Sequence, residues 1–125
     1  MDFKHKNARD SLRCAICGLA DAWRSERNMR LHTTMALIAV AAGVWLRLNR
    51  TEWLFLFSAI FLVMTMEMLN TSLERVVDLF TRDYHPLAGL AKNAAAGAAL
   101  LAAIYAMIVG TLLFLPRLLE SFNIF

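Results

Sequence analysis

The sequence contains few helix-breaking residues and few cysteines. Its 125 residues include 2 prolines and 5 glycines, so long uninterrupted helices are possible. The 2 cysteines, Cys14 and Cys17, form one C-x-x-C without a second pair or a histidine at zinc spacing, so we expect packing residues rather than a zinc site. Neither G-x-x-x-x-G-K-[ST] nor G-x-G-x-x-G occurs, so nucleotide binding cannot be inferred from a phosphate-binding loop.

Apolar residues dominate instead. They make up 59% of the chain, and the mean hydropathy of +0.52 is too high for an ordinary soluble domain. Uncharged runs cover residues 33–46, 53–66 and 94–115, the last stopping at Pro116. Each is near the ~20 residues that cross a bilayer, and helices satisfy their own backbone polar groups in lipid. We predict one all-α integral membrane domain over residues 1–125, with spans at 31–48, 53–69 and 94–115.

Basic residues predict the orientation of these spans, because cytoplasmic segments carry the excess of Lys and Arg. This rule places the N-terminus and the 75–92 segment in the cytoplasm, and the 47–52 loop and C-terminus on the other side of the membrane. The net charge of +3 fits this topology and anionic lipid headgroups, so we expect no nucleic-acid partner. The first 30 residues lack a continuous apolar core, so we expect no cleavable signal peptide. The basic residues before the first span are Lys4, Lys6, Arg9, Arg13, Arg24, Arg27 and Arg30.

Residues 11–30 have the pattern of an amphipathic helix, with Ser11 as a weak cap. The apolar stripe contains Leu12, Ile16, Leu19 and Trp23. We predict that residues 1–30 lie in the cytoplasmic interface of the membrane, with Trp23 at the depth of the headgroups.

Polar residues follow one face of the helix that continues the second span to about residue 80. Glu67, Asn70, Glu74 and Asp78 are spaced three, four and four apart, which places them on one side of an α-helix. A carboxylate in a membrane costs roughly 2.5–3.5 kcal/mol on insertion scales, which marks it as a candidate functional group. Glu67 and Glu74 are about 10 Å apart along the axis, so one small cation can hardly be held by both. We predict one metal ligand and one carboxylate with another role.

The segment after this helix adds complementary groups. Pro86 ends the helical pattern after His85, and Lys92 lies at the entrance of the third span. Together with the carboxylates, these groups suit a polyphosphate bound to Mg²⁺, because Mg²⁺ takes few carboxylates plus phosphate oxygens. The small residues at 94–99 favour close helix packing within the chain or between subunits, and three spans enclose little interior, so we expect an oligomer.

Four motifs carry a resemblance to a known family. They are Glu26-Arg-Asn, then Glu67-x-x-Asn70-Thr-x-x-Glu74-x-x-Val-Asp78, then His85-Pro-Leu-Ala, and Ala91-Lys92-Asn93-x-Ala-Ala-Gly97-Ala. Over residues 11–116 the chain resembles the small bacterial diacylglycerol kinases. Glu26-Arg-Asn, His85-Pro-Leu-Ala and Phe114-Leu-Pro are similar to the branch that phosphorylates undecaprenol.

The resemblance implies a homotrimer whose subunits share active sites and transfer the ATP γ-phosphate to a lipid alcohol at the cytoplasmic face. Undecaprenol is the expected acceptor, with diacylglycerol as the alternative. Glu67 would be the general base, Asn70 would position the reacting groups, and Glu26 and Glu74 would bind Mg²⁺. The implied ATP contacts are Cys14, Glu26, Glu74, Asp83, Tyr84, His85, Lys92 and Asn93, and the implied lipid contacts are Glu67, Trp23 and Ala96.

The chain departs from the family at Asn93, where an aspartate is usual, and at Cys14, where an aromatic residue is frequent. Asparagine keeps a carbonyl acceptor but loses the charge. Two interpretations stay open: the kinase tolerates asparagine at position 93, or the chain is a silenced, non-catalytic member of the family. A small proton-coupled multidrug exporter is disfavoured, because such proteins carry their glutamate within the first span, and the first span here has no acid.

Overall fold

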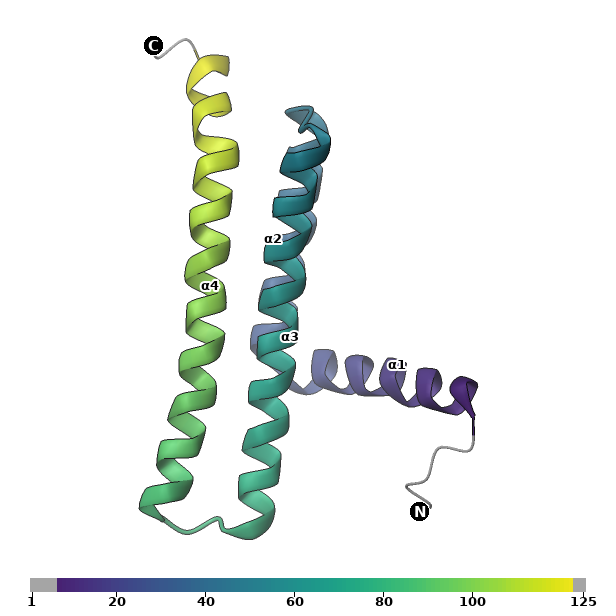
Figure 1. The fold of residues 1–125 in the computed structure, drawn as a ribbon, viewed down its shortest axis with the longest axis vertical. Helices are drawn as coiled ribbons and strands as arrows, with labels where there is room; N and C mark the ends of the chain where they lie inside the picture. The colour runs from purple at the N-terminus through teal and green to yellow at the C-terminus, as the bar shows by residue number, and fades with distance from the viewer. Residues whose placement is uncertain (1–6, 123–125) are drawn as a thin grey trace.

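The protein is described by a computed structural model covering residues 7–122, and every secondary-structure element in this range is a helix. The helices are α1 (Ala8–Ser25), α2 (Arg27–Trp45), α3 (Arg50–Phe80) and α4 (Pro86–Ser121). Helices α2, α3 and α4 run alongside one another, and α1 extends sideways from them, well above the α3–α4 loop (Figure 1). The all-α prediction is confirmed for this part of the chain.

Helix α1 is flanked by Asn7 at its N-terminal cap and Glu26 at its C-terminal cap. The Asn7 side chain accepts a hydrogen bond of 3.0 Å from the Asp10 backbone N–H, so the prediction of Ser11 as the cap is wrong. Glu26 has extended backbone angles, and the helix stops at Ser25 rather than at Arg30. The predicted apolar stripe, Leu12, Ile16, Leu19 and Trp23, is exposed along α1. Residues 1–6 of the predicted interfacial segment lie outside the described range.

The turn from α2 to α3 packs tightly around Gly43. A Cβ atom on this glycine would lie 2.9 Å from the Trp53 ring and 3.0 Å from Leu48. Arg47 takes the left-handed conformation in the turn, with φ 54°. Asn49 then begins α3 with a capping box, in which it and Glu52 each accept a backbone N–H of the other. Gly43 thus lets the two helices approach closely at this end.

The core lies between α3 and α4 and is small. Leu56 and Ala59 of α3 pack with Val109 and Leu113 of α4 and with Leu48 from the turn. Ser58 and Tyr105 hydrogen-bond across the same pair of helices at 3.2 Å. This packing holds α3 and α4 side by side over much of their length (Figure 1).

Two of the described helices, Arg50–Phe80 and Pro86–Ser121, are long and apolar enough to cross a membrane. Helix α2, which contains most of the predicted span at 31–48, is not among them; its first two turns carry Arg27, Arg30 and His32. Helix α4 does not stop at Pro116 but continues through it to Ser121. One residue later, the Arg117 guanidinium donates to the Leu113 carbonyl at 3.1 Å.

Candidate active site

Glu67 lies on the buried stripe of α3. This stripe consists of Leu56, Ala59, Val63, Glu67 and Thr71, and Glu67 is only 6% exposed. The three ion pairs formed within residues 7–122 all use other carboxylates. The carboxylate of Glu67 therefore sits where an apolar stripe becomes polar, without a cationic partner in the described chain, and is available to a substrate.

Asn70 and Glu74 form the next part of the polar face. Asn70 Nδ2 donates to Glu74 Oε1 at 3.3 Å, which orients the carboxylate. Asn70 Oδ1 is buried and has no hydrogen-bond partner within the described residues. Because buried acceptors are normally satisfied, this oxygen is open to a hydrogen bond from a bound group or water.

Asp78 and Lys92 join α3 to α4 at the far end of this face. Lys92 Nζ donates to Asp78 Oδ1 at 2.5 Å, and both side chains are partly exposed. Asn93, the residue after the lysine, is exposed. The structure thus brings the predicted lysine to the acidic face of α3 and gives it a carboxylate partner from that face.

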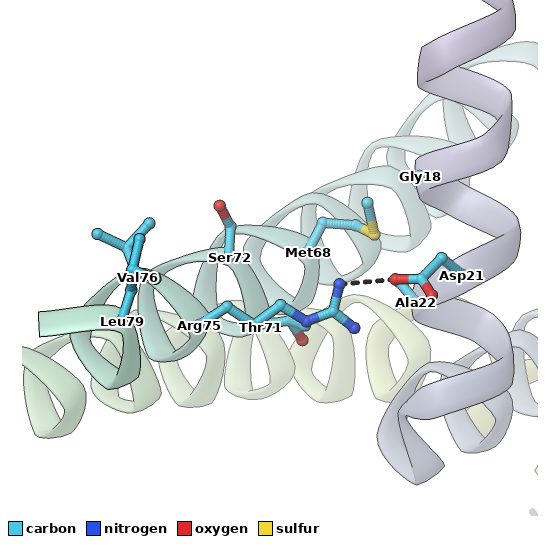
Figure 2. Close-up of a pocket in the computed structure, with 9 residues that line it drawn as sticks. All are labelled: Gly18, Asp21, Ala22, Met68, Thr71, Ser72, Arg75, Val76 and Leu79. Atoms are coloured by element: carbon cyan, nitrogen blue, oxygen red, sulfur yellow. Dashed lines mark hydrogen bonds and ion pairs between the residues drawn. The ribbon is translucent and has the colours of Figure 1, made fainter. Parts of the chain in front are cut away.

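Arg75 connects this face to α1, a contact that the sequence reading missed. Its Nη1 donates to Asp21 Oδ2 at 2.6 Å and its Nη2 to Ser25 Oγ at 2.9 Å. The hydrogen bond to Asp21 raises the pKa of Arg75, and the negative charges of Asp21 and Glu26 act in the same direction. Figure 2 shows Arg75 pointing from α3 towards α1. Asp21 and Arg75 are 54 positions apart, so no local sequence pattern predicts that they pair.

The predicted nucleotide residues Asp83, Tyr84 and His85 lie together in the α3–α4 loop and are exposed. Thr81 Oγ1 donates to the Asp83 carbonyl at 3.2 Å, and His85 Nδ1 accepts the Leu87 backbone N–H at 3.2 Å. His85 therefore caps α4 with one ring nitrogen and leaves the other for a ligand. The loop begins about 20 Å along α3 from Glu67, at ~1.5 Å per residue.

Three other predicted residues have exposed side chains that form none of the hydrogen bonds or ion pairs found within residues 7–122. Cys14 lies on α1, about 18 Å along the helix axis from Glu26, and α1 extends away from α4 (Figure 1). Cys14, Trp23 and Ala96 are all exposed. The small residues around Ala96 do not pack closely within the chain, since a Cβ on Gly97 would meet nothing within 4 Å. These residues are free to face another molecule.

The donor set can hold a metal only with help from a ligand. Within residues 7–122, no three His, Cys, Asp or Glu side chains are grouped so that they could hold a metal ion. Two carboxylates are nevertheless enough for Mg²⁺ when phosphate oxygens and waters complete its shell. Glu74 with the unpaired Asn70 Oδ1, and Glu26 near Arg75, fit that kind of shared site.

Comparisons with known proteins agree with this chemistry. The family described as "Prokaryotic diacylglycerol kinase" matches residues 13–114. An undecaprenol kinase of Bacillus subtilis is 41% identical over 81% of this chain and 82% of its own length. A diacylglycerol kinase of Synechocystis is 46% identical over 88% of this chain, which spans 63% of that relative. One from Escherichia coli K12 is 38% identical over 77% of this chain and 79% of its length.

Proposed function

The chain belongs to the prokaryotic diacylglycerol kinase family and is a lipid kinase, and from this premise we propose that it transfers the γ-phosphate of Mg²⁺-ATP to undecaprenol. The buried carboxylate of Glu67, at the point where the apolar stripe of α3 becomes polar, carries the proposal. A lipid alcohol can reach this carboxylate from the membrane while a nucleotide stays in water.

Glu67 acts as the general base. The lipid hydroxyl oxygen attacks the γ-phosphorus, the bond from that phosphorus to the β,γ-bridging oxygen breaks, and the hydroxyl proton passes to Glu67 as ADP leaves. Glu67 suits the role because no cation in the described chain already occupies its carboxylate. Asn70, one turn along α3, holds the Glu74 carboxylate and offers its unpaired oxygen to the reacting groups.

Glu26 and Glu74 hold Mg²⁺ on the nucleotide. When bound, the metal neutralises charge on the phosphate oxygens and orients them. The two glutamates come from different elements, the α1–α2 junction and α3, so the packing of α1 against α3 determines whether both reach one ion. Glu67 is about 10 Å from Glu74 along the axis, which leaves base and metal ligand with separate roles.

Lys92 contacts phosphate, and the loop residues Asp83, Tyr84 and His85 lie along the nucleotide. Asp78, itself part of the family motif, orients Lys92 through a 2.5 Å hydrogen bond, so Lys92 has a carboxylate partner that does not depend on position 93. Asn93 adds a neutral polar contact on the same turn of α4. This arrangement favours an active kinase over a silenced one.

The active site is completed by a neighbouring subunit in a homotrimer. The exposed positions of Cys14, Trp23 and Ala96 support this, as does Gly97 beside Ala96, where an added Cβ would meet nothing within 4 Å in the chain. Helix α2 provides most of the first membrane span, at 31–48, and the other two spans are at 53–69 and 94–115. The chain is placed in the bacterial plasma membrane with its N-terminus in the cytoplasm, so α1 lies in the cytoplasmic interface.

An apolar groove favours a lipid with a long hydrocarbon chain. It has a volume of about 520 Å³ between α2, α3 and α4 and includes Leu56, Ala59 and Val63, the apolar part of the stripe that reaches Glu67. The hydrocarbon chain of the acceptor would follow this groove with its hydroxyl at Glu67. The choice of undecaprenol is supported by the similarity to the undecaprenol kinase of Bacillus subtilis. Diacylglycerol is the second candidate, because two of the relatives named above are diacylglycerol kinases.

The proposal is tested by offering undecaprenol and diacylglycerol in parallel to the purified protein in micelles with γ-labelled ATP and Mg²⁺. Label on undecaprenol at much higher kcat/KM is the expected result. Preference for diacylglycerol would assign the other acceptor. Absence of label on both lipids, with transfer restored by Asn93→Asp, would identify a silenced kinase and contradict the role given to Asp78.

A further inference from the structure

Two arginines fix the end of α1, where Glu26 lies. Arg30 of α2 donates to the carbonyls of Trp23 at 3.2 Å and Arg24 at 2.7 Å. Arg75 of α3 donates to Asp21 at 2.6 Å and to Ser25 at 2.9 Å. Ser25 immediately precedes Glu26, and Arg75 immediately follows Glu74. The Arg75 contact therefore joins the chain neighbours of the two carboxylates.

Apolar packing contributes little to the position of α1. Ala22 is the only buried residue of this helix. A groove of about 410 Å³ lies between α1 and α3, lined by Gly18, Met68 and Val76 among others. In Figure 2 the Arg75 side chain lies along α3 and reaches Asp21 across this crossing. Because few apolar contacts hold α1 against α3, the Arg75–Asp21 ion pair contributes much of the contact between the two helices.

We propose that Arg75 is a positioning residue for the metal–nucleotide site: through Asp21 and Ser25 it holds the last turn of α1, and so sets the separation of the Glu26 and Glu74 carboxylates. The inference rests on the proposed function, in which these two carboxylates share Mg²⁺-ATP. A guanidinium suits the task because its planar fork holds two acceptors at once in a fixed geometry.

A second explanation would be that Arg75 acts only as a positive charge near the glutamates. The two explanations differ in the double variant Asp21→Arg with Arg75→Asp, which restores an ion pair but moves the positive charge from α3 to α1. Positioning predicts that the exchange restores the site. A purely local charge effect predicts that it does not.

The kinetic test measures phosphate transfer to lipid against Mg²⁺-ATP concentration for Arg75→Met. We expect the KM for Mg²⁺-ATP to rise about tenfold with kcat within about twofold, the pattern of lost binding rather than lost chemistry. Arg75→Lys should be intermediate, because one ammonium cannot span both acceptors in the same geometry. The exchange variant should return to within about threefold of the original KM.

Arg24→Met is the matched control. It removes an equal charge from the part of α1 that Arg75 contacts, and the Arg24 side chain makes no hydrogen bond or ion pair within residues 7–122. Its KM should not change. An unchanged KM in Arg75→Met, or a loss confined to kcat, would overturn the proposal. So would an exchange variant that folds but is no better than Arg75→Met alone.

A measurement without turnover separates this inference from the proposed function. Spin labels at Cys17, in a Cys14→Ser background, and at Phe80→Cys report the distance between α1 and the end of α3 when labelled chains are diluted into unlabelled ones. Arg75→Met should broaden the distance distribution, and the exchange variant should narrow it again. An unchanged distribution would overturn the positioning role even in an active kinase. A broadened distribution, combined with no phosphate transfer by the original protein with Cys14 and Phe80 unchanged, would refute the kinase proposal and leave the contact between α1 and α3 in place.

Discussion

Lys92 of α4 donates a 2.5 Å hydrogen bond to Asp78 of α3, so this lysine has a carboxylate partner although the residue beside it is Asn93. The pair connects the two helices that lead to the predicted phosphate site. It also bears on the departure at position 93, because Lys92 keeps a carboxylate partner on α3 when the residue after it is an asparagine.

Asp78→Asn should therefore harm the enzyme more than a change at position 93. We expect the variant to lower kcat/KM for ATP by about 10- to 100-fold, the range of losses for groups that orient a ligand, whereas Asn93→Asp should change it by less than about threefold. The measurement is the initial rate of lipid phosphorylation over a series of ATP concentrations. Asp10→Asn, on the exposed first turn of α1, is the control. A larger effect of Asn93→Asp than of Asp78→Asn would contradict the assignment.

Glu67→Gln should remove turnover and keep nucleotide binding. The amide cannot accept the hydroxyl proton, and general bases contribute about 10²–10⁴-fold to rates. Binding of a fluorescent ATP analogue with Mg²⁺ should remain within about threefold, because the metal ligands are unchanged. Glu120→Gln, exposed at the opposite end of α4, controls for loss of a carboxylate. Loss of binding equal to the loss of turnover would refute the division between base and metal ligand.

Glu74→Gln should instead raise the Mg²⁺ requirement. The change removes one of two metal-binding carboxylates but keeps an oxygen for the hydrogen bond from Asn70, so we expect the Mg²⁺ concentration for half-maximal rate to rise about 10- to 100-fold. A Mg²⁺ titration at saturating ATP measures this. The same titration on the Glu120→Gln protein should match the original, and a normal Mg²⁺ midpoint in Glu74→Gln would exclude Glu74 as a ligand.

Gly43→Ala should destabilise the fold without a direct effect on the chemistry. The added methyl would lie 2.9 Å from the Trp53 ring and 3.0 Å from Leu48, and overpacking of this kind costs about 1–3 kcal/mol. Thermal unfolding in micelles measures the loss. Gly89→Ala is the control, because a Cβ there meets nothing within 4 Å and alanine favours the helix. Equal midpoints for the two variants would show that α2 can shift to make room.

The sequence was sufficient where the cause is local. The spacing of Glu67, Asn70 and Glu74 predicts one helical face, and the structure places them on α3, with Asn70 bonded to Glu74. Pro86 predicts a break in the helical pattern, and the structure has a loop between the end of α3 at Phe80 and the start of α4 at Pro86. The break at Glu26 was not foreseen, because nothing in the residues around it is a strong helix breaker and its position depends on Arg30 folding back on α1.

The tertiary contacts could not be read in the same way. In the sequence Asp21 and Arg75 are ordinary charged residues, and only the crossing of α1 and α3 brings them together. The same holds for Asp78 and Lys92, which the sequence placed on one membrane face but did not pair. The apolar run ends at Pro116 as predicted, yet α4 continues through the proline to Ser121, and Arg117 pairs with Glu52 at the start of α3.

Helix α3 is continuous from Arg50 to Phe80, so a single rigid rod carries both the carboxylate at Glu67 and the one at Glu74. Their spacing is therefore sensitive to register as well as to side-chain identity. Inserting one alanine between Asn70 and Glu74 would turn every later residue by about 100° and advance it by about 1.5 Å. All three contacts would then be lost at once, those of Glu74 with Asn70, Arg75 with Asp21 and Asp78 with Lys92. The composition, charge and hydropathy of the chain would stay almost the same. A family built on this helix should tolerate many substitutions along the rod and almost no change in its length.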